Sequence, residues 1–433
     1  MWTPSKSTNY EGRRKAVGGT MLLTAFCLLL TSYCLLFPPS AFSEDLNLQQ
    51  LIDEALSNSP DLHASRARAA GAGYRIPQVQ TLPDPLVSVG YQNEGFKKYT
   101  YGTSEDAQWM FSASQTFPFP GKLALKGEAA AKESESTYAN YEALRLKTIA
   151  RVKELYFDLY IAYKDIDLLH ERTTLFSRVE DAALARYSTG KGSQQEVLMA
   201  QTEKYMLLEK NEILQQKIQS LEGLLNITVG RPADAPLGRP SDTSPSMFPY
   251  AMNDLIKIAN ERSPEIAAKD KMIGAAEAKV AFAKKDYIPD FTVAGSYFAR
   301  GNGFENMWSL TTSVNVPIFY RTKQRHAVNE ADASLNAARS EKELMRLTIA
   351  SAIKDNYSTL TASDRLMSLY KDGLIPKSRQ DVELALSGYK TGAVDALTVI
   401  TKLKSVIDFE ISYWGQFAEH EKAIARLEAI AGL

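Results

Sequence analysis

Residues that commonly carry out chemistry are sparse in this chain of 433 residues. Its four histidines are scattered, and none has the His-x-x-x-His or His-x-x-Glu-His spacing of a helical zinc site: His63, His170, His326 and His420. We expect each to lie on a helix surface. The Gly-x-Gly pairs at 71–73 and 301–303 lack the strand-to-helix context of a phosphate loop. No Ser/His/Asp set has a recognisable frame, so we predict no catalytic, cofactor or metal site and no enzyme.

Charge and targeting signals point to an exported protein. The 50 basic and 51 acidic side chains nearly balance, which argues against nucleic-acid binding because that needs a basic stripe. Residues 1–43 read as a signal peptide with basic residues at 13–15, an apolar run at 16–37 and cleavage after Ser43; an uncleaved membrane anchor is the alternative. Cys27 and Cys34 both lie in this segment, so the mature chain has no cysteine for a disulfide or a thiolate site.

An internal duplication organises the rest of the chain. The segment Leu51–Leu62 returns as Leu255–Ile266, and Arg186–Gly190 returns as Gly388–Gly392, each about 200 residues later. This period is far longer than the 20–50 residues of solenoid repeats. We therefore predict a first repeat over 44–230 and a second over 250–433. The linker at 231–249 holds five prolines, which favours an extended crossing segment.

Each repeat contains a pair of strands with alternating apolar and polar residues, at about 85–119 and about 290–318. The expected strands are about 10–12 residues long, which is enough to cross a bilayer when tilted. Four strands cannot close a barrel, and an open edge in lipid leaves backbone groups unpaired. If the strands lie in a membrane, the barrel is shared: three chains give twelve strands and two give eight. Two hairpins of a soluble β-domain are the alternative reading.

Very long helices follow each strand pair, at about 122–188 and 193–229 in the first repeat and about 321–390 and 395–430 in the second. The run from Lys122 to about Tyr187 contains no proline and spans about 95–100 Å as a helix. Gly373 and Pro376 are expected to kink the corresponding helix of the second repeat. Both helix pairs reverse direction at glycine-containing turns, where a positive φ is usually required.

Taken together, these features resemble the TolC-like outer-membrane efflux proteins over nearly the whole mature chain. The Pro-flanked strand pairs and the Tyr-x-x-Gly turns at Tyr187–Gly190 and Tyr389–Gly392 carry the resemblance. The segments Leu82–Pro85 and Ser114–Lys122 are most similar to the heavy-metal efflux branch, which includes CzcC and CusC.

That resemblance implies an α+β membrane protein with a homotrimeric, twelve-stranded transmembrane β-barrel in outer-membrane lipid, continued by a periplasmic α-helical coiled-coil barrel. It also implies a passive exit channel of a tripartite efflux system, served by an inner-membrane pump of the resistance-nodulation-division (RND) type and a periplasmic membrane-fusion adaptor. Metal cations or small toxicants are the cargo that we predict. Two alternatives are an exit duct for type I protein secretion and, from another class, a periplasmic coiled-coil adaptor.

The same resemblance suggests residues of a periplasmic gate at the helical turns. A carboxylate after the first turn that bonds a tyrosine before the second corresponds to Glu196 and Tyr389. An arginine that assists closure in some relatives falls on Val394, and an acidic ring falls on Thr398 and Thr401, so both features are replaced here. The resemblance further implies that adaptors dock at the turns. The remaining tip candidates are Gly190, Gly392 and Asp395, the carboxylate nearest to Val394.

Overall fold

The computed structural model describes residues 45–433, so the predicted signal peptide and both cysteines lie outside the described part of the chain. Two units are distinguished. Residues 45–46 and 237–239 form a small one, in which the Leu46 amide donates to the Arg239 carbonyl at 2.8 Å. Within residues 45–433, the helices and the longer strands all belong to the large unit, 47–236 and 240–433.

The first repeat begins with two short helices separated at Ser59, where Pro60 occupies the first helical position because its missing N–H is not needed there. Strands and long helices follow. The elements are α2 (Leu48–Asn58), α3 (Pro60–Gln80), β1 (Leu86–Gln92), β2 (Gln108–Phe117), α4 (Lys122–Ser188) and α5 (Gln194–Val229).

The second repeat has the same order: α6 (Met252–Arg262), α7 (Pro264–Lys285), β3 (Phe291–Ala299), β4 (Met307–Val314), α8 (Gln324–Ser368), η1 (Leu369–Leu374), α9 (Ile375–Thr391) and α10 (Ala396–Ala431). The long helix expected over 321–390 is interrupted by η1, a π-helical turn. Pro376 has no N–H and its ring clashes with the carbonyl four residues earlier, so the widened turn falls where Gly373 and Pro376 predicted a kink.

All four strands form one antiparallel sheet in the order β1-β2-β3-β4, so the central pair joins the two repeats. The strands contain 7 to 10 residues, so β2 reaches the expected length of 10–12 and the other three are shorter. At the helix-proximal end the β4 ladder stops at Val314, and the Asn315 amide donates to the Asp290 carbonyl just before Pro317. At the other strand ends, residues that continue the alternating pattern lie in loops and do not pair with a neighbouring strand.

Pairing in the sheet separates an apolar face from a polar face. One row across the four strands contains Val89, Phe111, Tyr297 and Trp308, and the neighbouring apolar row contains Val87, Ala113, Gly295 and Leu310. The opposite face carries a row of serines at 88, 112, 296 and 309. Large apolar side chains on the first face are open to the surroundings, with Trp308 78% and Leu310 69% exposed. The predicted alternation is therefore present in three dimensions.

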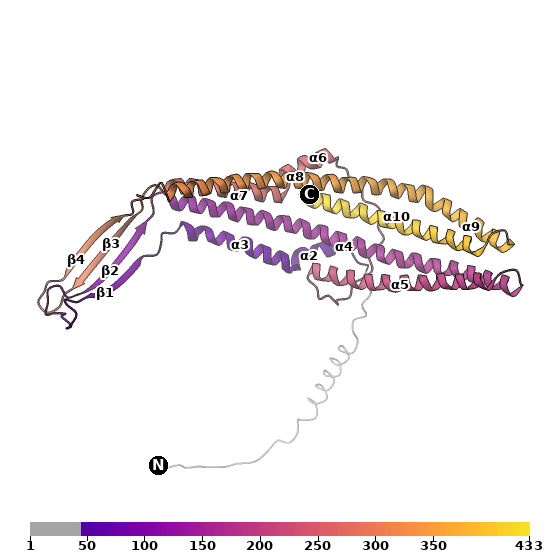
Figure 1. Cartoon of the computed structure of the whole chain (residues 1–433), viewed down its shortest axis with the longest axis horizontal. Coiled ribbons are helices and arrows are strands. Elements are labelled where there is room, and N and C mark those ends of the chain that lie inside the picture. Colours follow the sequence, from indigo (N-terminus) through magenta and orange to yellow (C-terminus); the bar gives the residue numbers. More distant parts are fainter. Residues whose placement is uncertain (1–44) are drawn as a thin grey trace, which may run out of the picture. The chain divides into compact units, whose positions relative to one another are not determined.

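The helices pack around α4, which contacts α3, α5, α7 and α10, while α8 packs against α7 and α10 (Figure 1). Within this unit the strands lie at the end where α4 begins, and the α4–α5 and α9–α10 turns lie at the other end (Figure 1). Buried apolar side chains line the seams between helices. No helix in the described part of the chain combines the length and the apolar character needed to cross a bilayer.

Candidate functional site at the helical turns

Two tight turns reverse the helices. In the first, Gly190 has φ +70° and donates its amide to the Tyr187 carbonyl at 3.0 Å. In the second, Gly392 has φ +82° and donates to the Tyr389 carbonyl at 3.1 Å. An L-residue rarely adopts these backbone angles, which explains why glycine stands at both positions.

Each returning helix starts with a side-chain cap. Ser193 accepts a hydrogen bond from the Glu196 amide at the start of α5. Asp395 accepts from the Thr398 amide at 2.8 Å at the start of α10, and this bonding to Thr398 lowers the pKa of Asp395. A carboxylate at the helix N-terminus also interacts favourably with the helix dipole. Asp395 is thus the N-cap of α10 in this structure.

The two turns meet through Glu196 and Tyr389. The Tyr389 hydroxyl donates to Glu196 Oε2 at 3.0 Å, which is the bond that the family resemblance implies. Tyr389 is wholly buried, whereas the Glu196 side chain is 22% exposed. Burial, together with the neighbouring carboxylate, raises the pKa of Tyr389 to about 12, so its hydroxyl keeps its proton and remains a donor at physiological pH.

An arginine that the sequence reasoning missed completes this contact. Arg186 donates from Nη1 to the Tyr389 carbonyl at 2.7 Å and from Nη2 to the Lys191 carbonyl at 3.0 Å. Its guanidinium lies 4.9 Å from the centroid of the Tyr389 ring, and its Nε lies 4.0 Å from Glu196 Oε2. In the sequence, Arg186 is marked only by its place in the duplicated turn, where the second repeat has Gly388 instead of an arginine.

The residues that replace the arginine and the acidic ring of some relatives have local roles. Val394 lies against Gly388, where an added Cβ would stand 2.7 Å from Val394 Cγ2. Thr401 donates its hydroxyl to the Leu397 carbonyl of its own helix at 2.8 Å. A cationic group is nevertheless present at the turns, because Arg186 reaches Tyr389 from the opposite helical hairpin.

An apolar cluster stabilises the four helices behind the turns. It joins side chains of α4, α5, α9 and α10, including Phe176, Val197, Val382 and Leu403, and Tyr389 is part of it. Burial of such side chains contributes about 1.5–3 kcal/mol each. The two helical hairpins therefore share one core at this end.

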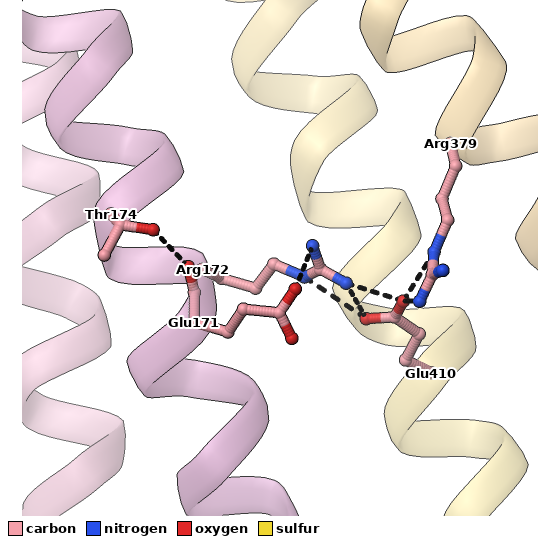
Figure 2. Close-up of polar contacts among 5 residues, drawn as sticks. All are labelled: Glu171, Arg172, Thr174, Arg379 and Glu410. Atoms are coloured by element: carbon pink, nitrogen blue, oxygen red, sulfur yellow. Dashed lines mark hydrogen bonds and ion pairs between the residues drawn. The ribbon is translucent and has the colours of Figure 1, made fainter.

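Farther along the same helices, Glu410 binds two arginines (Figure 2). Arg172 on α4 donates to both carboxylate oxygens, with Nη2 at 2.6 Å from Oε1 and 2.5 Å from Oε2. Arg379 on α9 donates from Nη2 to Oε1 at 2.6 Å. The Arg172 and Glu410 side chains are 8% and 4% exposed, while that of Arg379 is 60% exposed. This Arg172–Glu410–Arg379 triad links α4 of the first repeat to α9 and α10 of the second.

One histidine prediction is wrong. His420 is buried, not on a helix surface, because acidic groups and the linker surround it. Its Nε2 lies 3.0 Å from Asp364 Oδ1 on α8, and its Nδ1 lies 3.0 Å from Glu421 Oε1. Glu421 also accepts from the amide and the hydroxyl of Ser246 in the linker. Burial alone would raise the pKa of Glu421, but the bonds from His420 and Ser246 outweigh it and lower that pKa.

Among residues 45–433, no three His, Asp or Glu side chains stand close enough together to hold a metal ion.

Comparison with known proteins decides the family. The model of the outer membrane efflux protein family matches residues 51–228 and 255–404, one segment in each repeat. The chain belongs to the outer membrane efflux protein family. Members of this family are passive channels and not enzymes, form trimers, and work with RND-type pumps and periplasmic adaptors. This efflux protein is therefore an outer-membrane exit channel, which excludes the periplasmic adaptor alternative.

Named relatives align with this efflux protein over most of their length. The pyoverdine export outer membrane protein OpmQ of Pseudomonas putida is 23% identical over 89% of this chain and 84% of its own. The cobalt-zinc-cadmium resistance protein CzcC of Cupriavidus metallidurans is 22% identical over 92% of each chain. The crystal structure of the outer membrane protein VceC of Vibrio cholerae superposes with a TM-score of 0.77 at 20% identity, over 89% of this chain and 96% of that one. The fold is thus that of known outer-membrane channels.

Proposed function

We propose that three copies of this chain form a twelve-stranded outer-membrane barrel through which a tripartite pump expels metal cations. The four-stranded sheet carries this proposal: β1 and β4 each pair on one side only within the described residues, and one face of the sheet is apolar and exposed. In lipid, unpaired backbone groups cost several kcal/mol each, so another copy must pair with each open edge.

Three copies fit the sheet better than two. The polar face carries hydroxyl groups on every strand, and Thr116 and Thr292 bond through their hydroxyls at 2.9 Å where the repeats join. A row of hydroxyls suits a water-filled lumen, whereas an eight-stranded barrel is only wide enough to be filled by its own side chains. Trimers are also the assembly that the family forms.

The contact between Glu196, Tyr389 and Arg186 closes the periplasmic entrance in this proposal. It joins the two helical hairpins of one chain, and the shared apolar core holds them together behind the turns. Opening requires α9 and α10 to move away from α4 and α5, which breaks this contact. Gly190 and Gly392 are exposed in the turns, where an adaptor from the periplasm can reach them.

Metal cations are the proposed cargo because CzcC, a metal resistance protein, aligns over 92% of both chains. Export of a chelator is the second candidate, because OpmQ is a pyoverdine exporter and aligns over 89% of this chain. An RND-type pump would supply the energy and a membrane-fusion adaptor would bridge it to the turns. The channel itself needs no metal ligands, since selection takes place in the pump.

A deletion strain tests the cargo. The gene is restored as wild type or as Leu310→Arg, a charge on the exposed apolar face that opposes membrane insertion. Growth is then measured on a panel of metal salts, chelators, dyes and antibiotics. Sensitivity to a few metal cations that only the wild type relieves supports metal export. Loss of chelator release alone supports the second candidate, and loss of a secreted protein alone supports type I secretion.

Assembly is tested on the purified protein. Native mass spectrometry in detergent should give three chains, and planar bilayers should show conductance. A stable dimer, or a protein released from the outer membrane by high salt, would contradict the proposed barrel.

A further inference from the structure

The loop between β1 and β2 lies at the strand ends remote from the helices (Figure 1). It carries an exposed aromatic side chain beside two exposed lysines. Its Phe96 is entirely exposed, at 108% of the reference area for that side chain. Lys97 and Lys98 follow directly, and both are exposed. No ion pair or hydrogen bond of either ammonium group is found in residues 45–433. A solvated, exposed phenylalanine beside two unpaired cations suggests a surface made for a partner.

This loop is held in one shape. The Asn93 side chain accepts from the Tyr91 hydroxyl at 2.8 Å and from the Thr100 amide at 2.9 Å, and donates to the Gly95 and Lys98 carbonyls, both at 2.8 Å. Gly95 has φ +78°, which lets the chain turn immediately before Phe96. A preformed loop loses little conformational entropy when it binds.

Aromatic contacts place the loop on the apolar side of the sheet. Tyr91 pairs with Trp109 in the β1–β2 ladder, in register with the apolar rows. The Tyr99 ring stacks on the Tyr91 ring with centroids 5.1 Å apart, and Trp109 lies at the same distance from Tyr91. Tyr101 lies 6.5 Å from Tyr91. The loop therefore folds over the side of the sheet that faces lipid in the proposed barrel.

Two acidic residues of these loops have partners other than the lysines. Glu94 accepts a hydrogen bond from the Ser104 hydroxyl, and Glu105 pairs with Arg300 at 3.7 Å. Lys97 and Lys98 are the cationic groups that follow Phe96 directly in this loop, and both are exposed.

We propose that Phe96, Lys97 and Lys98 form an anchor for a phosphate-bearing lipid of the outer leaflet. The ring enters the boundary between headgroups and acyl chains, where aromatic side chains are favoured, and the two ammonium groups bind the lipid phosphates. The inference rests on the proposed function only in placing these loops at the outer surface of the membrane. It adds a ligand site that the channel activity does not require.

Lipid binding to the full-length assembly in detergent tests the anchor. The probes are lipid A and the same lipid A after enzymatic removal of its phosphates, and bound lipid is counted by native mass spectrometry. Each lysine at an anionic surface contributes about fivefold in affinity, so Lys97→Gln with Lys98→Gln should weaken binding of the phosphorylated probe about 25-fold. Phe96→Ser should weaken binding of both probes. Lys354→Gln with Lys377→Gln, at exposed helix positions, is the matched control and should change neither.

Several outcomes would overturn the anchor. Equal binding of both probes to the wild type would show that the site does not recognise phosphate. So would a loss of affinity in the lysine variant no larger than in the helix control. If the loop variants dissociate the assembly but leave lipid binding unchanged, the loop contacts a neighbouring copy of the chain and not a lipid. Conductance is measured on the same samples: a conducting wild type without phosphate-dependent binding refutes the anchor alone, whereas a wild type that neither assembles nor conducts refutes the proposed function.

Discussion

Replacement of Glu410 by glutamine should destabilise the protein by about 3 kcal/mol, which is the lower end of the range for breaking a buried ion pair. The lower end applies because the two arginines differ in exposure. Arg379 has a side chain that is 60% exposed and can turn to water, whereas Arg172 is 8% exposed and keeps an uncompensated charge. Glu171, 3.3 Å from the Arg172 guanidinium, is 64% exposed and only partly offsets that charge.

The measurement is the free energy of unfolding from reversible urea titration in detergent micelles. The matched control is Glu203→Gln, which breaks a pair with Lys404 at 3.1 Å that also joins the two repeats but is more exposed. Exposed pairs contribute about 0–1 kcal/mol. The double variant Arg172→Met with Glu410→Leu should recover most of the loss, because apolar replacement of a whole buried pair is often neutral. A loss for Glu410→Gln no larger than that for the control would refute this reasoning.

Three further predictions concern pH and the turns. Burial raises the pKa of Asp165 from 3.8 to about 6, and its Oδ1 has no hydrogen-bond partner among the described residues. Asp165 therefore stays protonated to higher pH in the folded state than in the unfolded state, so the free energy of unfolding falls as pH rises from about 4 to about 6. Asp165→Asn should flatten this pH dependence in unfolding titrations. It should add about 3 kcal/mol to the free energy of unfolding at pH 8 but little at pH 3.5. Tyr389→Phe removes a charge-assisted hydrogen bond of about 1.5 kcal/mol, which should raise the open population, and with it the single-channel open probability, about tenfold. The same change at the exposed, duplicated Tyr187 should leave gating unaltered, and equal effects of the two would contradict the proposed contact. Gly392→Ala should cost about 1–2 kcal/mol in unfolding titrations because φ is +82° there, whereas Gly415→Ala, inside α10 with open space around it, should be neutral or stabilising.

Local pattern was enough to predict most of the fold. The proline-free run predicted a helix over 122–188, and α4 covers Lys122–Ser188, because helix continuity depends on each residue and its near neighbours. Alternation predicted both faces of the sheet for the same reason. Gly190 and Gly392 were predictable from the backbone angles that tight reversals require.

Contacts that depend on distant residues were not predictable from pattern. Glu410 and Arg172 are 238 positions apart and resemble ordinary charges on a solvated helix face. His420 is buried only because Asp364, Glu421 and the linker meet around it. The bond between Glu196 and Tyr389 came from the family resemblance, since no local feature links residues 193 positions apart.

Pairing of β2 with β3 has a consequence for biogenesis. Thr116 and Thr292, which meet in this pair, are 176 residues apart, so the sheet cannot form until the second repeat has crossed the inner membrane as far as β3 and β4. During export β2 has one edge without its partner, and such edges promote aggregation. The first half of the newly exported chain therefore needs a periplasmic holding chaperone that shields β2 until β3 emerges. Depletion of such factors should harm this protein more than exported proteins whose strands all pair with near neighbours.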